Sequence, residues 1–530
     1  MPTLDWIGKK AVLNHHRQVP YRLLRCDASL SAGDPDCGNL LVQGDNLLAL
    51  KALLPYYAGK VKCIYIDPPY NTGNENWVYN DAVNSPEMQK WLGKVVGAEV
   101  EDLSRHDKWL CMMYPRLSLL KEFLTEDGVI FVSIDDTELG HLRCLMDELF
   151  GPANFVSSVV WQKRTSPDAR ATIGPAHDSI VAYARSLSRF KERRLLLPLT
   201  GDQTKGYKNP DNDPRGPWSS VDMTAQVGHA TPEQFYDIVS PAGKRLPPPQ
   251  GRCWGYAEAT VRKLIDDNRV WFGKTGKSRP RLKRFLSEAE GVAPWTWWTN
   301  QEVGHNQEAK QELIEILGRD VDFETPKPLR LLRRILQLGA LSDSLILDSF
   351  VGSGTTAHAT LALNNADAGH RRFIVIEMDE RISRAVTAER LRRAIHGYGD
   401  TKGLGGGFRY CNLAEPLFDE TGNIRECVAF RELAAHIFFT ETGSPIPKQV
   451  TGRSPFLGVH EGKAVYLLFN GVLGDKRADG GNVLTGEVLR KLPNHNGTKV
   501  IYGEGCRLGP ARLKREGIIF KQIPYHIKVS

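Results

Sequence analysis

The segment Val61-Lys-Cys-Ile-Tyr-Ile-Asp-Pro-Pro-Tyr70 decides the fold, because a short apolar, β-branched run stops there at two prolines. Proline cannot donate to the ladder of a central strand, so the pattern predicts a buried strand followed by a rigid loop. Open α/β sheets form their ligand crevices at the carboxyl ends of such strands. Asp67 and Tyr70 are therefore candidate site residues.

The loop from Asp67 to Tyr70 has the acceptors and the ring that a conjugated amino group, such as that of adenine, requires. Asp67 and the backbone carbonyl of Pro68 can accept the two N–H bonds of such a group, and the two prolines, Pro68 and Pro69, fix the direction of that carbonyl. Tyr70 offers a face for stacking, which offsets part of the cost of extracting a base from a duplex. Taken alone, four such residues could also form a simple turn after a strand.

A second motif, Leu345-Ile-Leu-Asp-Ser-Phe-Val-Gly-Ser-Gly-Thr-Thr356, predicts a strand, a glycine turn and a helix that begins near Thr355. Gly352 and Gly354 let a ligand approach the backbone N–H groups closely. Farther along, the strand ending at Glu377 places a carboxylate where it can accept from ribose hydroxyls. The third glycine of the dinucleotide fingerprint is missing, so the pattern favours a nucleoside cofactor without a pyrophosphate.

Together, Asp67-Pro-Pro-Tyr70 and Phe350-Val-Gly-Ser-Gly354 resemble the catalytic and cofactor motifs of amino-group DNA methyltransferases, in the order of the beta class. Further pieces are similar to the modification (Mod) subunit of type III restriction-modification systems, and the likeness spans roughly residues 38 to 415. These pieces are Gln43-Gly-Asp-Asn46, Asn71-Thr-Gly73, Tyr79-Asn-Asp81 and Thr325-Pro-Lys-Pro328.

The resemblance implies a doubly wound, mostly parallel α/β sheet of the Rossmann-like type that binds S-adenosyl-L-methionine. It implies a site-specific enzyme that transfers methyl to N6 of a flipped adenine, within a restriction-modification or phage-defence system. The residues carried over as cofactor-binding are Asp45, Thr325, Lys327, Asp348, Phe350, Gly352, Gly354, Thr355 and Glu377. Asp45 could equally cap a helix that begins at Asn46, and Glu377 departs from the type III pattern.

Two other functions remain open. N4 of cytosine is also a conjugated amino group that the same loop could hold, although Asp at the first loop position favours adenine. A DNA-binding subunit without catalysis is the second alternative, but both motifs are intact here. C5-cytosine chemistry needs a thiolate nucleophile, and no Pro-Cys pair occurs in the chain.

The resemblance implies that the middle of the chain recognises the target DNA, because this insertion occupies the place where target recognition sits in the family. Seven of the 11 tryptophans fall between Trp161 and Trp298, and Arg269 to Arg284 holds seven lysines or arginines without an acid, beside Trp271 and Phe272. Such a segment suits phosphate contacts and base stacking. The DNA-binding residues expected there are Lys274, Lys277, Arg279, Arg281, Lys283 and Arg284.

The length of 530 residues suggests several modules. We expect an N-terminal extension (1–37), a methyltransferase core in two parts (38–190 and 323–402), the target-recognition insertion (191–322) and a C-terminal module (403–530) with a small α/β unit. Double-stranded DNA is the expected partner, consistent with the net charge of +7. A second copy of the chain, or a helicase, nuclease or other defence subunit, is left open.

Composition indicates a cytoplasmic protein without a membrane role. Of all residues, 41% are hydrophobic and 25% are charged, no stretch approaches the roughly 18 apolar residues of a membrane span, and Met1 to Lys10 lacks the features of a signal peptide. Nine cysteines are scattered without a C-x-x-C pair. We therefore expect reduced thiols and neither a metal site nor a disulfide.

Overall fold

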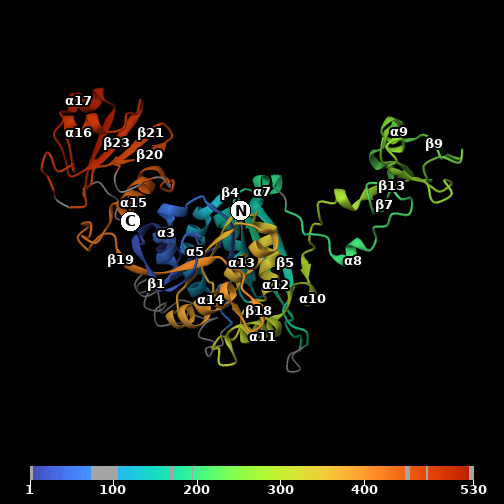
Figure 1. The fold of residues 1–530 in the computed structure, drawn as a ribbon, viewed down its shortest axis with the longest axis horizontal. Coiled ribbons are helices and arrows are strands. Elements are labelled where there is room, and N and C mark those ends of the chain that lie inside the picture. The colour runs from blue at the N-terminus through green and yellow to red at the C-terminus, as the bar shows by residue number, and fades with distance from the viewer. Residues whose placement is uncertain are drawn as a thin grey trace. The chain divides into compact units, whose positions relative to one another are not determined.

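The computed structural model describes residues 4–72, 105–166, 172–193, 195–447, 450, 454–472 and 475–523. The chain forms two compact units: the first comprises Met1–Leu195 and Trp295–Ser530, and the second comprises Leu196–Pro294 (Figure 1). Of the sequence pieces above, Gly73 and Tyr79-Asn-Asp81 lie outside the described residues. The second unit falls within the segment assigned to target recognition, and the domain boundaries given above stay predictions.

A sheet of ten strands forms the centre of the first unit, within the described residues. Neighbouring strands run parallel from β19 to β4, while β1 and β6 are antiparallel to their neighbours. This topology confirms the expected doubly wound, mostly parallel sheet. Its order is β1 (Arg22–Gly33), β19 (Gly407–Pro416), β2 (Leu40–Gln43), β16 (Arg372–Glu377), β15 (Leu345–Asp348), β3 (Val61–Ile66), β4 (Leu124–Ile134), β6 (His177–Ala184), β5 (Phe155–Gln162) and β14 (Trp297–Trp298).

Helices bury both faces of this sheet. Alternate residues of β3 point to opposite faces, as a strand requires: Ile64 packs in one core cluster, and Cys63 and Tyr65 pack in the other. A strand that is buried on both faces explains why its sequence is almost continuously apolar. One cluster includes α3 (Asn46–Tyr57), α5 (Arg105–Phe123) and α6 (Leu139–Phe150); the other includes α12 (Leu329–Gly339), α13 (Thr355–Asp367) and α14 (Glu389–His396).

The central sheet also takes in strands from both ends of the chain. β1 lies in the segment assigned to the N-terminal extension, and β19 lies in the segment assigned to the C-terminal module. Beyond β19, the chain forms a sheet with the order β20 (Phe456–His460), β21 (Lys463–Leu467), β23 (Thr498–Gly503) and β25 (Ile518–Gln522), preceded by α15 (Phe430–Thr442). Its last three strands are parallel, which matches the expected small α/β unit.

Shorter elements complete the first unit, and none of the helices in the described part of the chain has the length and apolarity that a membrane crossing requires. These elements are α1 (Lys9–Val12), α2 (His15–Gln18), η3 (Pro152–Asn154), α7 (Leu187–Glu192), α10 (Asn300–Val303), α11 (Asn306–Leu317), η7 (Ile382–Ala388), β17 (Gly397–Tyr398), β18 (Thr401–Lys402), β22 (Val483–Leu484), α16 (Gly486–Lys491), β24 (Gly505–Cys506) and α17 (Pro510–Arg515).

The second unit is built from short strands around a small core that includes Trp254 and Phe272. A three-stranded sheet has the order β12 (Val270–Trp271), β13 (Arg281–Phe285) and β7 (Trp218–Asp222). Its other elements are α8 (Gly201–Thr204), β8 (Thr224–Gln226), η4 (Val227–His229), η5 (Pro232–Gln234), β9 (Ile238–Val239), β10 (Arg245–Leu246), β11 (Arg252–Trp254), α9 (Glu258–Asp266) and η6 (Leu286–Glu288).

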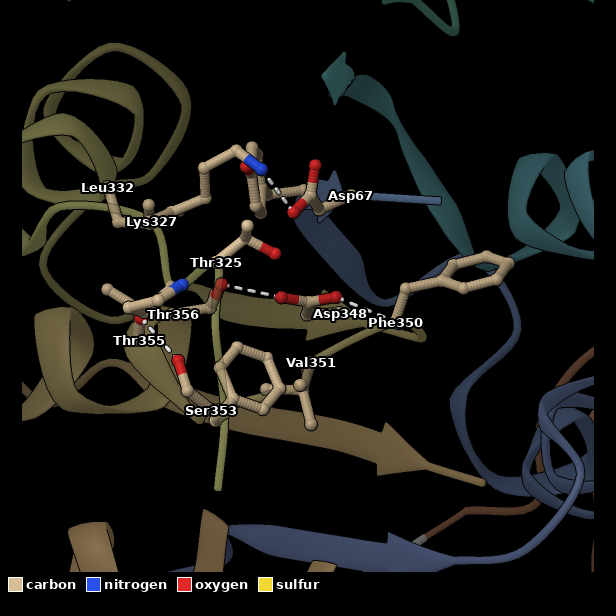
Figure 2. A pocket seen from close by; sticks show the side chains of 14 residues that line it. Asp67, Thr325, Lys327, Leu332, Asp348, Phe350, Val351, Ser353, Thr355 and Thr356 are labelled. Atoms are coloured by element: carbon tan, nitrogen blue, oxygen red, sulfur yellow. Dashed lines mark hydrogen bonds and ion pairs between the residues drawn. The ribbon is translucent and has the colours of Figure 1, made fainter. Parts of the chain in front are cut away.

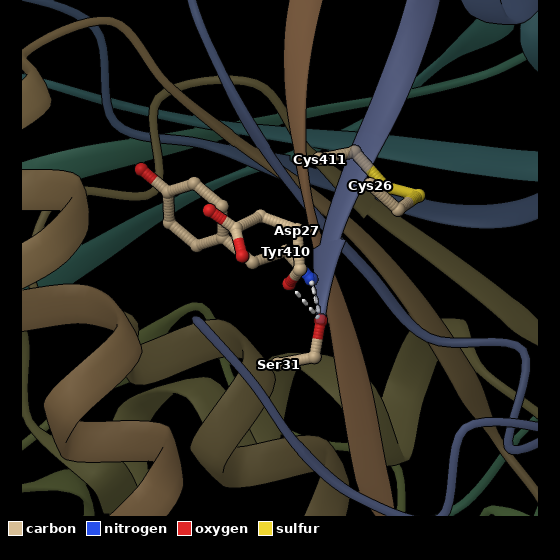
Figure 3. The surroundings of a disulfide bond; sticks show 5 residues. All are labelled: Cys26, Asp27, Ser31, Tyr410 and Cys411. Carbon is tan, nitrogen blue, oxygen red and sulfur yellow. Dashed lines mark hydrogen bonds between the residues drawn. A yellow bond between two sulfur atoms is a disulfide. The ribbon is translucent and has the colours of Figure 1, made fainter. Parts of the chain in front are cut away.

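One cysteine expectation is wrong. Cys26 of β1 and Cys411 of β19 face each other in the antiparallel pair and form a disulfide (Figure 3). They are 385 residues apart in sequence, so no spacing rule could pair them; only the register of the two strands brings the sulfur atoms together. The other seven cysteines are free thiols.

Candidate active site

A pocket opens where β3 and β15 end side by side in the sheet. Because both strands are parallel, their carboxyl ends carry Asp67 and Asp348 to the same edge, and both carboxylates line the pocket (Figure 2). Seven of the predicted site residues are brought together there. They are Asp67, Thr325, Lys327, Asp348, Phe350, Gly352 and Thr355.

Asp67 is held by two neighbours. The hydroxyl of Tyr70 donates to its Oδ1 at 2.9 Å, and Lys327 forms an ion pair with its Oδ2 (Figure 2). The Lys327 ammonium also lies 5.1 Å from the centre of the Tyr70 ring. Burial, together with the Asp67 carboxylate, raises the pKa of Tyr70 well above its usual value. Tyr70 therefore stays neutral and donates a hydrogen bond to Asp67. The positive charge that pairs with Asp67 is the Lys327 ammonium, which belongs to the Thr325-Pro-Lys-Pro328 segment.

The carbonyl groups of the two loop prolines differ in their hydrogen bonding. The Pro69 carbonyl accepts from the indole N–H of Trp109 at 2.7 Å, which fastens the loop to α5. Among the described residues, the Pro68 carbonyl accepts no hydrogen bond. The role of the Pro68 carbonyl as an acceptor for the amino group stays a prediction.

Asp348 has a more enclosed environment than Asp67. It is 1% exposed and accepts from the Thr356 hydroxyl and from the Phe350 N–H at 3.0 Å. Burial raises the pKa of Asp348 to about 7, and the nearby carboxylates of Asp67 and Glu377 add to the rise. A cationic ligand group in the pocket would favour the ionised form of Asp348.

The glycine turn after β15 has the conformation that its sequence predicts. Gly352 and Gly354 have φ angles of 52° and 83°, in the left-handed region that glycine adopts without strain. Glu377 of β16 is 3% exposed and supports the turn: its Oε2 accepts from the Gly352 N–H, and its Oε1 accepts from the Asp379 N–H. The ribose role of Glu377 stays a prediction.

Asp45, the remaining cofactor candidate, does not line the pocket. Its Oδ1 caps α3 by accepting from the Leu48 N–H at 3.0 Å, and its Oδ2 pairs with Arg116, whose side chain is 1% exposed. The capping alternative that the sequence left open is therefore present. A contact between Asp45 and a cofactor remains a prediction.

Comparison with known proteins places this chain in a family. A model of the family described as DNA methylase matches residues 61–388. The chain belongs to that family. It is 36% identical over 401 residues to the Type III restriction-modification enzyme StyLTI Mod subunit of Salmonella typhimurium, covering 73% of this chain and 60% of that protein. It is 30% identical to the Type II methyltransferase M.KpnI of Klebsiella pneumoniae, over 64% of this chain and 81% of that protein.

These similarities confirm the expected resemblance to type III Mod subunits. The chain spans 60% to 66% of the length of three such subunits that it matches. Among solved structures, TTHA0409 of Thermus thermophilus, complexed with S-adenosyl-L-methionine, aligns at 13% identity with a TM-score of 0.32, over 70% of this chain and 99% of that one.

The DNA methylase pocket also contains residues that were not singled out from the sequence. Thr356 was quoted within the glycine motif, but its bond to Asp348 depends on the first turn of α13. Phe323 precedes the Thr325 segment and adds an apolar wall; Tyr65 and Leu332 also line the pocket. Alternation along β3 could have identified Tyr65, because it lies two residues before Asp67 on the same face.

The basic segment of the second unit divides into exposed and buried residues. Lys283 is 1% exposed and forms ion pairs with Asp211 and Asp213. It supports the fold of this unit and is not available to a phosphate. Phe272 is 4% exposed and belongs to the core, so the stacking role considered for it is also excluded. The other expected contacts are exposed and stay predictions: Lys274, Lys277, Arg279, Arg281 and Arg284.

Proposed function

We propose that the chain is the methyltransferase part of a type III modification subunit, which transfers methyl from S-adenosyl-L-methionine to N6 of an adenine flipped out of DNA. The observation that carries this proposal is the position of Asp67, held by the Tyr70 hydroxyl and Lys327, in the same pocket as the residues of the glycine turn. Membership of the DNA methylase family supports the same activity.

The pocket suits S-adenosyl-L-methionine in charge and shape. That cofactor carries a sulfonium and an ammonium group, and Asp348 offers a buried carboxylate to a cation. Phe323 and Val351 supply apolar surface, and α13 begins directly after the glycine turn, where the helix dipole favours the cofactor's carboxylate. When bound, the cofactor supplies an electrophilic methyl group.

The chain's own residues would hold the amino group of the base. Its lone pair is delocalised into the ring, so an acceptor on each N–H favours the geometry in which the nitrogen can attack. Asp67 and the Pro68 carbonyl are such acceptors on adjacent residues, and Trp109 keeps the loop in place through Pro69. The Tyr70 hydroxyl and Lys327 orient the carboxylate before the base arrives, which lowers the reorganisation needed at the reaction.

Double-stranded DNA is the proposed substrate, and the five exposed basic residues of the second unit are proposed phosphate contacts. The Salmonella typhimurium relative is named as a subunit of a restriction-modification enzyme. We therefore propose that this chain also works with other subunits, such as a helicase and nuclease subunit or a second copy of itself. Measuring DNA methylation by the chain alone and by the chain with its partner subunits tests this directly.

Single-molecule sequencing tests the proposal, because it distinguishes N6-methyladenine from N4-methylcytosine. DNA is taken from cells that express the wild type, the Asp67→Ala variant or no protein. The proposal expects N6-methyladenine at one sequence motif with the wild type only. N4-methylcytosine instead would favour the alternative base, which the matched family also covers. No mark from the wild type, even with its neighbouring genes present, would favour a binding subunit without catalysis.

A further inference from the structure

Two histidines and a carboxylate gather behind the catalytic loop, outside the pocket. His106 at the start of α5 places its Nδ1 2.7 Å from Oε1 of Glu138, and His141 of α6 places its Nδ1 2.8 Å from Oε2 of the same carboxylate. The ligand atoms of the three residues all lie within 4.8 Å of one another. The two imidazole rings lie side by side, with centroids 4.8 Å apart.

Glu138 differs from the exposed acids that commonly gather on protein surfaces, because its side chain has no solvent exposure. Among the described residues, it forms ion pairs only with His106 and His141. Neither of these partners is a lysine or an arginine. A buried carboxylate without a compensating cation is costly.

We propose that His106, Glu138 and His141 bind a divalent transition-metal ion of the Zn²⁺ type. Two imidazole nitrogens and a carboxylate are a ligand set that zinc accepts, and ligand distances near 2.0–2.2 Å place the donor atoms of a tetrahedral site about 3.3 Å apart. The two distances from histidine Nδ1 to the Glu138 oxygens, 2.7 and 2.8 Å, are shorter than this value, and all ligand atoms lie within 4.8 Å of one another. Small side-chain movements therefore complete the site. The side chains of His106 and His141 are 38% and 36% exposed, which gives the ion a path from solvent and leaves a position for water.

The ion would act on the catalytic loop through Asn71. This residue follows Tyr70, has a left-handed φ of 59°, and donates from Nδ2 to Oε1 of Glu138 and to the Arg105 carbonyl. Asn71 therefore stands in the outer shell of the site, where such bonds orient metal ligands. A bound ion would fix Glu138, and Glu138 in turn fixes the end of the loop.

Zinc binding by the full chain tests the site without any methylation assay. The metal-free chain is titrated with Zn²⁺ against a chromogenic chelator, and Co²⁺ is used as a second probe because its absorption reports tetrahedral nitrogen and oxygen ligands. The proposal expects about one ion per chain, and a loss of affinity of at least about a hundredfold in His106→Asn and in His141→Asn. Glu138→Gln should also lose the ion while keeping an acceptor for Asn71.

His177→Asn is the matched control, because His177 has a similar exposure of 37% beside a single carboxylate, Asp136. It should bind zinc like the wild type. Thermal melts with and without S-adenosyl-L-methionine show whether each variant is folded; a variant that fails this check is replaced by the corresponding glutamine. No stoichiometric Zn²⁺ or Co²⁺ binding by the wild type overturns the proposal, and so does equal binding by the wild type and His141→Asn.

Discussion

Charged side chains have different surroundings in the pocket of the first unit and in the basic segment of the second. In the pocket, the paired side chains of Lys327 and Asp67 keep 10% and 19% of their surface exposed. In the second unit, the side chains of Lys283 and Asp213 form a pair with no exposed surface. A ligand can reach the Lys327–Asp67 pair and replace one of these two side chains as the partner of the other. The Lys283–Asp213 pair is closed to solvent, so it breaks only when the second unit unfolds. Substitutions in the two regions should therefore separate function from stability.

The largest effect is expected at Asp67. In Asp67→Ala, the amino group of the base loses its charged acceptor, and Lys327 is left facing the pocket. We expect methyl transfer to fall by about a hundredfold to a thousandfold, the size seen when a preorganised polar group of an active site is removed. Cofactor affinity should stay within a few-fold of the wild type, measured by calorimetry. Transfer near the wild-type rate would remove Asp67 from the mechanism and erase the contrast between the two regions.

The counterpart in the second unit is Lys283→Ala. This change removes the ammonium partner of the buried Asp213 and of the partly exposed Asp211, while Arg215 still pairs with Asp213. The free energy of unfolding should therefore fall by about 3 kcal/mol, the lower end of the range for a broken buried pair. Thermal and denaturant unfolding of the chain measure this loss. Arg284→Ala is the control, since Arg284 is the next residue of β13 and is exposed; it should melt like the wild type. Equal melting of all three would mean that Lys283 does not support the fold.

Gly354→Asp tests the cofactor side of the pocket. Gly354 has a φ of 83°, and a Cβ atom there would lie 3.2 Å from Cγ2 of Thr387. An acid at this position adds strain, crowding and a negative charge next to the start of α13, where the cofactor's carboxylate is expected. We expect cofactor affinity to fall at least about a hundredfold. Wild-type affinity in a folded variant would refute the placement of the cofactor at this turn.

We expect Asp348 to make cofactor binding depend on pH. Because its pKa is raised to about 7, the cofactor's cation must displace a proton when the pH is lower than this value. Affinity should therefore fall as the pH decreases through 7, by up to about tenfold per unit. Calorimetry at several pH values measures the slope. Asp348→Asn should bind weakly with no such slope; a wild-type affinity that is constant from pH 6 to 8 would exclude this role for Asp348.

The features that were predicted correctly from the sequence are those that the path of the backbone determines. The ends of β3 and β15 were recognisable from an apolar run followed by two prolines and from an apolar run followed by glycines. Parallel pairing then brings Asp67 and Asp348 together without any further information. Lys327 was expected to bind the cofactor, and its ion pair with Asp67 could not be foreseen, because it depends on how two loops approach each other.

The parts that were missed depend on which face of an element a side chain occupies. Lys283 and Arg284 are adjacent on β13, and the strand turns one into the core and the other to the surface. The charge pattern of Arg269 to Arg284 cannot tell them apart, because the acids that pair with Lys283 lie about 70 residues earlier. The pairing of Cys26 with Cys411 was missed for the same reason, because the two residues are 385 positions apart and only strand pairing brings them together.

The smallest expected effect is at Lys277, an exposed residue of the basic segment. A lysine that contacts one phosphate releases about one counterion, so Lys277→Ala should weaken DNA binding several-fold at every sequence and lower the slope of log K against log salt by about 1. Lys244→Ala is the control, because Lys244 is exposed in the same unit but lies outside the segment. Titrations of labelled duplex DNA at several salt concentrations measure both variants. If Lys277→Ala and Lys244→Ala share the wild-type slope, exposure in this segment does not mark DNA contact. The difference between exposed and buried charges in the second unit would then predict the effect of a substitution on stability but not on DNA binding.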